Sequence, residues 1–329
     1  MSDAKLKVHL SDLDDDRFRL RLDELLEEAR CAASIEFVDA GAACDILVAG
    51  VPTRDQLMPP AGAPKTLIIP WSGVPRSVAS LCSELPGLAV HNVHHNAIPV
   101  AEHAIGMLLS VGRRLIPSDR ALRSGDWRTR FAPTDAPLIA GRRALILGAG
   151  AIARRIAHIC KGLDVTTTLL ARRRRKDEDT GCQLLGPEDL DEALTRAEIL
   201  FIALPLTPAT DGLIDARRLA LLPPGAIVIN VARGPILDEE ALYTGLVSGA
   251  LAGAGIDVWY TYPKGAAARA HTHPSKFPFG DLDHVVLSPH RAGHGLATER
   301  LCAEHLAPLL IAAAKGDPLP NRVHPELGY

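Results

Sequence analysis

The chain has 329 residues, of which 47% are hydrophobic, so it is long enough to bury large cores in two domains of ordinary size. Its formal net charge of -3 argues against a nucleic-acid-binding protein, which usually carries a clearly basic face, and suits a small neutral or anionic partner. The six cysteines form no CxxC pair, and neither a signal peptide nor a run of roughly 18 apolar residues is evident, so we expect a cytoplasmic protein with free thiols and no membrane span.

The first part of the chain alternates apolar strands with helical segments, which is typical of a parallel sheet covered by helices. Between the first two strands, Phe18, Leu22, Leu25, Leu26 and Ala29 recur with the spacing of one apolar helix face. We therefore predict a small open α/β unit. Its five strand candidates are KVHL (7–10), SIEFV (34–38), CDILVAG (44–50), TLIIP (66–70) and LAVHNV (88–93).

A second series of strands follows VAEHAIGMLLSVGRRLI (100–116), which is predicted to form one long helix between the two series. Six strands with helical spacers are enough for a complete doubly wound nucleotide-binding fold. The six candidates are ALILGAG (144–150), DVTTTLLA (164–171), EILFIALP (198–205), AIVINVA (226–232), AGAGIDVW (252–259) and HVVLS (284–288).

The last part of the chain, ATERLCAEHLAPLLIAAAKG after Gly295, has helical periodicity and no strand to follow it. We expect it to return and pack on the first unit. The predicted domains are therefore residues 1–98 plus 294–329 and, inserted between them, residues 99–293. The charge run RRRRKDED (172–179) is expected to be a solvated turn.

The segment GAGAIA (148–153) lies directly after an apolar strand and opens a helix, as a dinucleotide-binding fingerprint does. Gly148 would allow the tight turn, Gly150 the close approach of the pyrophosphate, and Ala153 the packing of the helix. The backbone N–H groups of Ala151 and Ile152 would bind the pyrophosphate at the helix N-terminus.

The specificity position for the cofactor lies at the end of the next strand, where an acid would accept a hydrogen bond from the ribose 2'-hydroxyl. Here the strand ends in arginines, beginning with Arg172 and Arg173, and no carboxylate occurs before Asp177. Guanidinium groups can bind a 2'-phosphate, so NADP(H) is favoured over NAD(H). If the arginines form only a solvated turn, the cofactor preference stays open.

Several segments together resemble the D-isomer-specific 2-hydroxyacid dehydrogenase family, and they occur in the family's order. The resemblance implies two doubly wound parallel-sheet α/β domains, a Rossmann dinucleotide-binding domain inserted in a flavodoxin-like substrate domain, with the active site in the cleft between them. It also implies a homodimer formed through the helix that begins at VAEHA. The matching segments are VAEHA (100–104), GDW (125–127), GAGAIA (148–153), LPLTPATDGLI (204–214), NVARGPILDEEAL (230–242), GAGIDV (253–258) and SPHRAG (288–293).

The resemblance also implies roles for residues of this chain. Arg233 would bind the substrate carboxylate and polarise its carbonyl; the alternative is a surface arginine paired with Asp238 or Glu239. His290 would be the proton donor and acceptor, rather than a structural histidine, and Asp257 would lie near the nicotinamide. The further cofactor contacts are Leu204, Pro205, Thr210, Val231, Ala232 and Gly293, and the substrate contacts are Trp71, Ser72, Gly73 and Asn96.

One position departs from the family pattern. Most members have a glutamate, in a DVxxxEP segment, that hydrogen-bonds the catalytic histidine, whereas DVWYTYP (257–263) has Tyr262 there. A neutral phenol can orient the His290 ring but compensates its positive charge poorly. We therefore expect a reductase of a small 2-oxo acid, such as glyoxylate or hydroxypyruvate, whose pH profile is shifted downward.

Two other functions stay open at this point. Formate dehydrogenases of the same superfamily have a neutral glutamine at the Tyr262 position and an asparagine like Asn96, so oxidation of formate, or of another small donor such as phosphite, is one alternative. A dinucleotide-sensing co-repressor is the other.

Two further features carry hypotheses. His91, His94, His95 and His103 lack a metal-ligand spacing, so we expect no metal and a structural or cleft-lining role. The long connection YPKGAAARAHTHPSKFPFG (262–280) is a candidate lid or substrate-selecting loop, or else an unstructured surface excursion.

Overall fold

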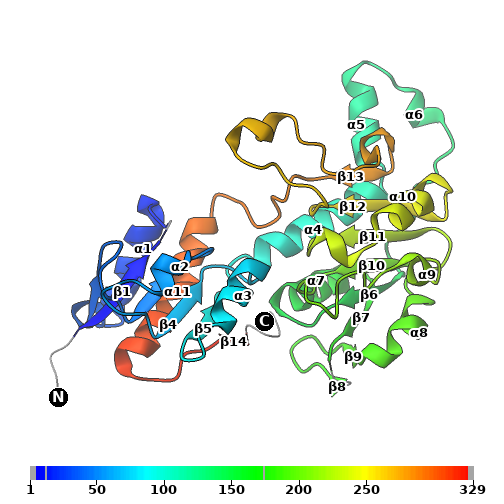
Figure 1. Cartoon of the computed structure of the whole chain (residues 1–329). Helices are drawn as coiled ribbons and strands as arrows, with labels where there is room; N and C mark the ends of the chain where they lie inside the picture. The colour runs from blue at the N-terminus through cyan, green and yellow to red at the C-terminus, as the bar shows by residue number, and fades with distance from the viewer. Residues whose placement is uncertain (1–4, 12, 173–174, 325–329) are drawn as a thin grey trace. The chain divides into compact units, whose positions relative to one another are not determined.

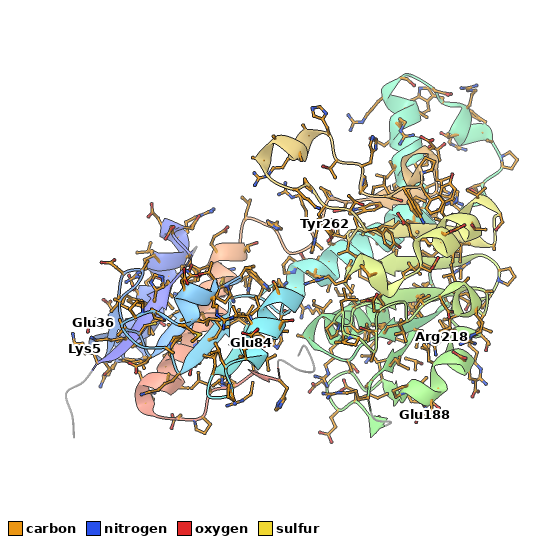
Figure 2. The ribbon with its side chains drawn as sticks, in the orientation of Figure 1. Lys5, Glu36, Glu84, Glu188, Arg218 and Tyr262 are labelled. Atoms are coloured by element: carbon orange, nitrogen blue, oxygen red, sulfur yellow. The ribbon has the colours of Figure 1, made fainter. Side chains whose placement is uncertain are left out.

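A computed structural model describes residues 5–11, 13–172 and 175–324, and the chain divides into two compact units (Figure 1). Unit 1 comprises Met1–Ala97 and His294–Tyr329, and unit 2 comprises Ile98–Gly293. Unit 2 is therefore an insertion in the chain of unit 1. Side chains fill the space between each sheet and its helices (Figure 2).

Unit 1 is built on a sheet with the strand order β14-β5-β4-β3-β1-β2, in which β1 to β5 are parallel. This is the flavodoxin-like order, and the five predicted strands are confirmed. The sixth strand was not predicted, because it has only two residues; it pairs antiparallel with β5. The strands are β1 (Leu6–Leu10), β2 (Ile35–Phe37), β3 (Ile46–Val48), β4 (Thr66–Ile69), β5 (Ala89–Asn92) and β14 (Arg322–Val323).

Helices cover both faces of the unit 1 sheet. Phe18 and Leu22 of α1 pack with Leu306 and Leu310 of α11 in one apolar core, which confirms that the last helix returns to unit 1. Asp15 caps α1 by accepting hydrogen bonds from the backbone N–H groups of residues 17 and 18. The helices are α1 (Asp16–Glu28), η1 (Ala32–Ser34), α2 (Arg54–Leu57), α3 (Arg76–Ser83) and α11 (Thr298–Lys315).

Unit 2 is built on an eight-stranded sheet with the order β13-β12-β11-β10-β6-β7-β9-β8. All pairs are parallel except β8 with β9, and the order reverses beside β6, as in a doubly wound nucleotide-binding fold. The strands are β6 (Arg143–Leu147), β7 (Thr166–Leu170), β8 (Arg175–Lys176), β9 (Gln183–Leu185), β10 (Ile199–Ile202), β11 (Ala226–Asn230), β12 (Leu251–Ile256) and β13 (Val285–Leu287).

The count of six strands for unit 2 was wrong, because β8 and β9 were missed. The strand β9 has only two apolar residues and no apolar run around them, and β8 has two residues within the charge run that was expected to be only a solvated turn. The run itself is also not wholly solvated, since Asp177 is buried. Arg173 and Arg174 lie outside the described residues.

Adjacent residues of the unit 2 strands face opposite apolar cores, as expected for a sheet that is buried on both sides. Leu145 and Leu147 contribute to the core beneath α8 and α10, and Ile146 to the core beneath α4 and α7. The helices are α4 (Ala97–Gly112), α5 (Leu115–Arg123), α6 (Arg128–Phe131), α7 (Ala151–Gly162), η2 (Pro187–Asp189), α8 (Leu190–Leu194), α9 (Ala216–Leu219), η3 (Gly234–Ile236), α10 (Glu239–Val247), η4 (Ala266–Ala270) and η5 (Phe279–Asp281).

The prediction of one continuous helix over residues 100–116 was right up to Gly112 and wrong at residues 113–114, where the helix is interrupted. The helix α4 ends at Gly112, Arg114 adopts a left-handed conformation with φ of 52°, and α5 begins at Leu115. The Arg114 guanidinium donates to the backbone carbonyl of Ala252 and pairs with Asp135, and these contacts hold the chain at the break. Figure 1 shows α5 and α6 extending away from the unit 2 sheet.

Candidate active site

The turn after β6 has the geometry of a dinucleotide-binding loop. Gly148 has φ of +118°, and a Cβ there would lie 2.6 Å from the backbone oxygen of Ala203, so only glycine fits. No atom lies within 4 Å of a Cβ built on Gly150, which leaves that surface open to a ligand. Ala153 is fully buried where α7 packs on the sheet. Each of the three small residues therefore has the environment that the fingerprint requires.

The N-terminus of α7 supplies donors for an anion. The first backbone N–H of this helix with an intrahelical partner is that of Arg154, which donates to Gly150. The N–H groups of Ala151 and Ile152 precede it and have no intrahelical acceptor. Together with the helix dipole they favour a negative charge such as a pyrophosphate. The residues present fit the cofactor that the sequence predicts.

Asp177 cannot serve as a free acceptor for a ribose hydroxyl, because its carboxylate is already bound. It is 2% exposed, and it accepts from the Arg154 guanidinium at 2.9 Å and from the Thr180 hydroxyl at 2.8 Å. Burial opposes ionisation, but the hydrogen bonds from Arg154 and Thr180 outweigh it and lower the pKa of the Asp177 carboxyl. Arg172 is exposed just beyond the end of β7, and Arg173 lies outside the described residues.

The predicted cofactor contacts after β10 and β11 also lie at the carboxyl edge of the sheet. Thr210 donates from its hydroxyl to the backbone carbonyl of Pro205 at 2.6 Å, which closes the loop that follows Leu204. Val231 and Ala232 follow β11 directly and are each 7% exposed. Ligands of open α/β sheets bind at this edge.

Arg233 is held by the turn after β11 against the segment after β12. The Asn230 side chain donates to the backbone carbonyl of Arg233 and accepts from the backbone N–H of Ala232. A Cβ on Gly234 would lie 2.4 Å from the backbone oxygen of Trp259, so this position requires glycine. The close approach places the Arg233 turn beside the DVWYTY segment.

The Arg233 side chain has no carboxylate partner among the described residues. Its guanidinium donates only to the backbone carbonyl of Ala232, at 2.6 Å, while Asp238 caps α10 and Glu239 binds the backbone and side chain of the loop at Ser275. The surface ion pair with Asp238 or Glu239 is therefore wrong. Burial lowers the pKa of the Arg233 guanidinium, which still stays protonated at neutral pH. A half-buried, unpaired guanidinium can receive an anionic ligand.

The turn that carries His290 is fixed by Asp257, at the carboxyl end of β12. This carboxylate is 1% exposed and accepts from the Ser288 hydroxyl at 2.5 Å and from the backbone N–H groups of Arg291 and Ala292 at 2.8 and 3.1 Å. His290 itself is exposed and has φ of 57°, an uncommon conformation for a residue other than glycine. The hydrogen bonds on both sides of His290 hold it there.

The sequence did not indicate this role of Asp257. Asp257 and Ser288 directly follow the neighbouring strands β12 and β13, and their contact depends on how these two strands pair. A further contact was also missed: the imidazole of His103, on α4, lies 3.0 Å from the Ser288 hydroxyl and 3.6 Å from Asp257.

Tyr262 contacts His290 directly. Its phenolic oxygen lies 2.9 Å from Nδ1 of His290 and accepts a hydrogen bond from the backbone N–H of Trp259 at 3.1 Å. Burial raises the pKa of the Tyr262 phenol, and the positive charge of Arg233 opposes this only in part. The phenol is therefore neutral near pH 7 and hydrogen-bonds the ring without bringing a negative charge. Figure 2 labels Tyr262 in unit 2.

Two of the predicted substrate contacts of unit 1, Ser72 and Asn96, are hydrogen-bonded to each other beyond the carboxyl ends of β4 and β5. The Ser72 hydroxyl donates to the side-chain oxygen of Asn96 at 2.5 Å and lies 3.2 Å from Nδ1 of His94. The Trp71 ring packs against Gly50. A Cβ on Gly50 would lie 1.6 Å from this ring, so a larger residue at position 50 would displace it. The Ser72 hydroxyl therefore already has hydrogen-bond partners within unit 1. Gly73 follows Ser72 in the same loop.

The four histidines singled out in the sequence have separate environments. His91 contacts the backbone carbonyl of Pro320 at 2.7 Å, His94 contacts Ser72, and His103 contacts Ser288. Burial, with the nearby His305 and His94, lowers the pKa of His95 to about 4. The described residues contain no group of three potential metal ligands.

The connection after Tyr262 is ordered rather than an unstructured excursion. It contains η4 and η5, its Ser275 hydroxyl donates to Glu239 at 2.6 Å, and Phe277 stacks on Tyr243 with ring centroids 5.0 Å apart. The base of this connection is therefore fixed on α10.

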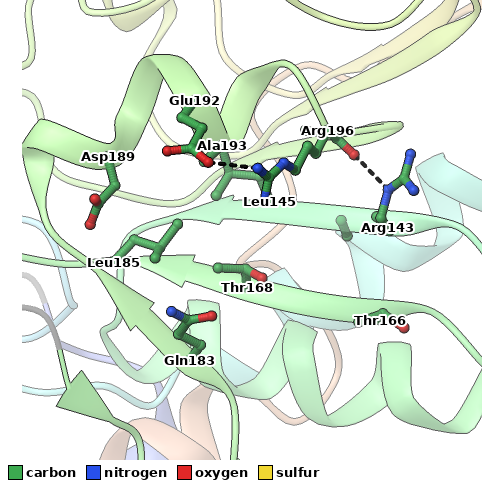
Figure 3. A pocket seen from close by; sticks show the side chains of 12 residues that line it. Arg143, Leu145, Thr166, Thr168, Gln183, Leu185, Asp189, Glu192, Ala193 and Arg196 are labelled. Carbon is green, nitrogen blue, oxygen red and sulfur yellow. Dashed lines mark hydrogen bonds and ion pairs between the residues drawn. The ribbon is translucent and has the colours of Figure 1, made fainter.

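One hollow in unit 2 lies away from the predicted site. It measures about 400 Å³ and lies between α8 and strands β6, β7 and β9 (Figure 3). Its walls include Thr166, Thr168, Gln183 and the ion pair of Glu192 with Arg196. None of the predicted catalytic or cofactor residues lines it, so it does not bear on their chemistry.

Residues 105–292 match the family model described as D-isomer specific 2-hydroxyacid dehydrogenase, NAD binding domain. A glyoxylate reductase of Thermofilum pendens is 34% identical over 230 residues, which cover 69% of this chain and 65% of that protein. A D-3-phosphoglycerate dehydrogenase of Mycobacterium tuberculosis is 30% identical over 297 residues, 85% of this chain and 53% of that protein. The match thus spans less than two thirds of either relative's length.

The fold is similar to that of a D-isomer specific 2-hydroxyacid dehydrogenase from Xanthobacter autotrophicus Py2, solved in complex with NADPH and MES. The two chains are 27% identical, the TM-score is 0.78, and the alignment covers 99% of this chain and 100% of the other. The likeness therefore extends through both units.

Proposed function

Because the chain belongs to the D-isomer-specific 2-hydroxyacid dehydrogenase family, we propose that it transfers a hydride between NADP(H), or NAD(H), and a small 2-oxo or 2-hydroxy acid. We propose that the reaction runs in the direction of reduction, with glyoxylate, hydroxypyruvate or a larger analogue as the substrate. The observation that carries this proposal is the contact of His290 with Tyr262, beside an unpaired Arg233. The similarity to glyoxylate reductases supports it.

The Arg233 guanidinium is proposed to bind the substrate carboxylate and to polarise the carbonyl oxygen. When bound, the dinucleotide supplies the hydride that reduces the carbonyl carbon. Its pyrophosphate would be held by the turn at Gly148 and Gly150 and by the N-terminus of α7. In unit 1, the backbone of Ser72 and Gly73 would bind the carboxylate, with Trp71 and Asn96 as further substrate contacts.

His290 is proposed to donate a proton from Nε2 to the carbonyl oxygen during reduction and to take it back from the hydroxyl during oxidation. Nδ1 faces Tyr262, and we assign Nε2, the other ring nitrogen, to the substrate. The phenolic oxygen can accept from a protonated Nδ1 or donate to an unprotonated one, so it is a partner for both states of the ring. Asp257 would act by holding the His290 turn rather than by touching the reacting atoms.

NADP(H) is proposed as the preferred cofactor. The Asp177 carboxylate is occupied by Arg154 and Thr180, while Arg172 lies just beyond the end of β7. This arrangement offers no free acid for the ribose hydroxyl and places a cation just beyond β7, where the group that selects the cofactor is expected. Comparison of kcat/KM for NADPH and NADH with glyoxylate tests it; an equal value for the two cofactors would refute the preference.

Replacing Tyr262 by glutamate is expected to extend the reductase activity by about one pH unit toward higher pH. Reduction needs a protonated His290, so activity falls as pH rises through the titration of that ring. A carboxylate at position 262 would stabilise the protonated ring, and the fall would then occur at higher pH. The measurement is kcat/KM for glyoxylate as a function of pH.

The matched control for this change is Tyr262→Gln, which has nearly the shape of glutamate but no charge. We expect the Gln variant to keep the pH midpoint of the parent chain. Coincident profiles for the Glu and Gln variants would show that position 262 does not compensate the charge of His290.

We also propose a homodimer and a cytoplasmic location. The arm formed by α5, α6 and the following loop exposes large apolar side chains, including Trp127 at 63% and Phe131 at 80% exposure. Such a patch is unusual on a monomer. The full set, called here the apolar arm, is Leu115, Ile116, Leu122, Trp127, Phe131 and Leu138.

The proposed cytoplasmic location is supported by the cysteines. All six are free, which fits a reducing compartment. The described residues contain no helix that could span a membrane.

The double variant Leu122→Asp/Phe131→Asp is expected to be monomeric at micromolar concentration, because burying two carboxylates in an apolar interface is costly. Sedimentation equilibrium gives the mass. The control is Val247→Asp, which changes an exposed apolar residue of unit 2 outside the apolar arm and should leave a dimer. A monomeric parent chain, or a dimeric double variant, would contradict the proposal.

A further inference from the structure

The loop that follows Tyr262 carries positive charge and no negative charge. Residues 263–273, called here the basic loop, contain Lys264, Arg269, His271 and His273 and no aspartate or glutamate. All four basic side chains are exposed, and none has an ion-pair partner among the described residues. Surface arginines elsewhere in unit 2 do have such partners, for example Arg120 with Asp283 and Arg217 with Asp191.

The two ends of the basic loop meet beside the His290–Tyr262 pair. The backbone N–H of Thr261 donates to the carbonyl of Pro274 at 3.0 Å, so the residues before and after the loop are joined. Below this point the chain is fixed, since Glu239 accepts from the Ser275 hydroxyl at 2.6 Å and from the backbone N–H of Lys276 at 3.1 Å. The basic loop thus begins and ends at one point, and the residues that follow it are held on α10.

Covalent geometry and one backbone hydrogen bond place the two ends of the basic loop near the acid-base pair. Lys264 is two residues beyond Tyr262, so their Cα atoms are at most about 7 Å apart. Tyr262 in turn lies 2.9 Å from His290. His273 directly precedes Pro274, whose carbonyl accepts a hydrogen bond from Thr261. The backbone at His273 has therefore returned close to Tyr262. The backbone that carries Lys264 therefore lies close to the pair, and a cation within the Debye length of about 10 Å acts on a substrate anion.

The tip of the loop has its own structure. Residues Ala266–Ala270 form η4, and the Thr272 hydroxyl and the His271 backbone N–H both donate to the carbonyl of Ala268, at 2.8 and 3.2 Å. Arg269 is therefore presented from a folded turn, which lowers the entropy lost when it binds a ligand.

Resting on the proposed function of a 2-oxo acid reductase, we propose that the basic loop selects substrates with a second anionic group. Arg233 is assigned to the carboxylate next to the reacting carbonyl, and the loop would bind a carboxylate or phosphate at the other end of the substrate. The reaction stays the same; the substrate class becomes that of dianionic 2-oxo acids.

The test compares matched pairs of substrates that differ by one anionic group. The pairs are 2-oxovalerate with 2-oxoglutarate, for a carboxylate, and hydroxypyruvate with 3-phosphohydroxypyruvate, for a phosphate. In the parent chain, kcat/KM is expected to be at least about tenfold higher for the dianion of at least one pair. The pair that shows the preference identifies the group that is bound.

The double variant Lys264→Ala/Arg269→Ala is expected to lose about tenfold in kcat/KM for the preferred dianion and less than about twofold for its monoanionic partner. Raising the salt concentration should weaken the preference of the parent chain for the same reason. The control, Lys7→Ala/Lys65→Ala, removes the same charge from exposed lysines of unit 1, next to the amino ends of β1 and β4, and should keep the preference.

Equal losses for both members of a pair in the loop variant, or no preference in the parent chain, would overturn the role of the loop while leaving the reductase function intact. If no 2-oxo acid is turned over, the proposed function fails. The role of the basic loop is then tested by the binding of the substrate pairs alone. The dissociation constants of the same pairs from the NADP⁺ complex are then measured by tryptophan fluorescence. Tighter binding of the dianion, lost in the loop variant, supports the loop, and equal binding refutes it.

Discussion

Replacement of His290 by alanine is expected to lower kcat for the reduction of glyoxylate by about a thousandfold, the usual scale for removal of a positioned general acid. The KM for the 2-oxo acid should change little, because Arg233 and the unit 1 contacts remain. NADPH binding, measured by the fluorescence of the nicotinamide, should stay within about twofold. The residual activity should also lose its fall at high pH, since the titrating ring is gone.

The fold should survive this change, because the His290 side chain is exposed and its turn is held by the backbone contacts to Asp257. His158→Ala, an exposed histidine on α7 away from the turn at Gly148, is the matched control and should keep full activity. Turnover of the His290 variant at the rate of the control would remove His290 from the scheme.

Replacement of Arg233 by alanine is expected to lower kcat/KM by about ten thousandfold. This side chain is assigned two tasks, binding the carboxylate and polarising the carbonyl, so its loss should raise KM and also lower kcat. That pattern differs from the kcat effect expected for His290. Steady-state kinetics over a wide range of glyoxylate concentration separates the two parameters.

Arg233→Lys tests the geometry of the guanidinium rather than its charge. Lysine keeps the positive charge but not the planar pair of donors, so we expect it to recover only part of the loss, about ten- to a hundredfold. Thermal unfolding of both variants checks the fold, because Arg233 is half-buried between the turns of Gly234 and Trp259. A lysine variant as active as the parent chain would show that bidentate binding is not required.

The positions of most strands along the chain and the glycine turn were predictable because each depends on local sequence. The apolar runs at β1 to β5 and at the six predicted strands of unit 2 are visible in the sequence, and Gly148 and Gly150 occur directly between a strand and a helix. The strands β8 and β14 have only two residues each, and β9 has only two apolar residues with no apolar run around them, which is why these three were missed. The break after α4 depends on contacts of Arg114 with Ala252 and Asp135, residues distant in sequence.

The same holds for the candidate site: its local motifs were visible in the sequence, and the contacts between distant segments were not. The resemblance named Arg233, His290 and Tyr262, but only the structure shows that the phenol of Tyr262 lies at hydrogen-bond distance from the His290 ring. The occupation of Asp177 by Arg154, and of Asp257 by Ser288 and two backbone N–H groups, also depends on packing between separate segments. Such pairings have no signature in the spacing of one sequence.

The most direct test of the central claim is a single panel of cofactor assays at several pH values. Oxidation of NADPH and NADH is followed with glyoxylate, hydroxypyruvate and longer 2-oxo acids, and reduction of NADP⁺ and NAD⁺ is followed with formate and phosphite. We expect reduction of a 2-oxo acid, at a rate that is higher with NADPH than with NADH and that falls as pH rises, and no oxidation of formate or phosphite. Dinucleotide binding without turnover of any 2-oxo acid, or oxidation of formate or phosphite instead, would contradict it.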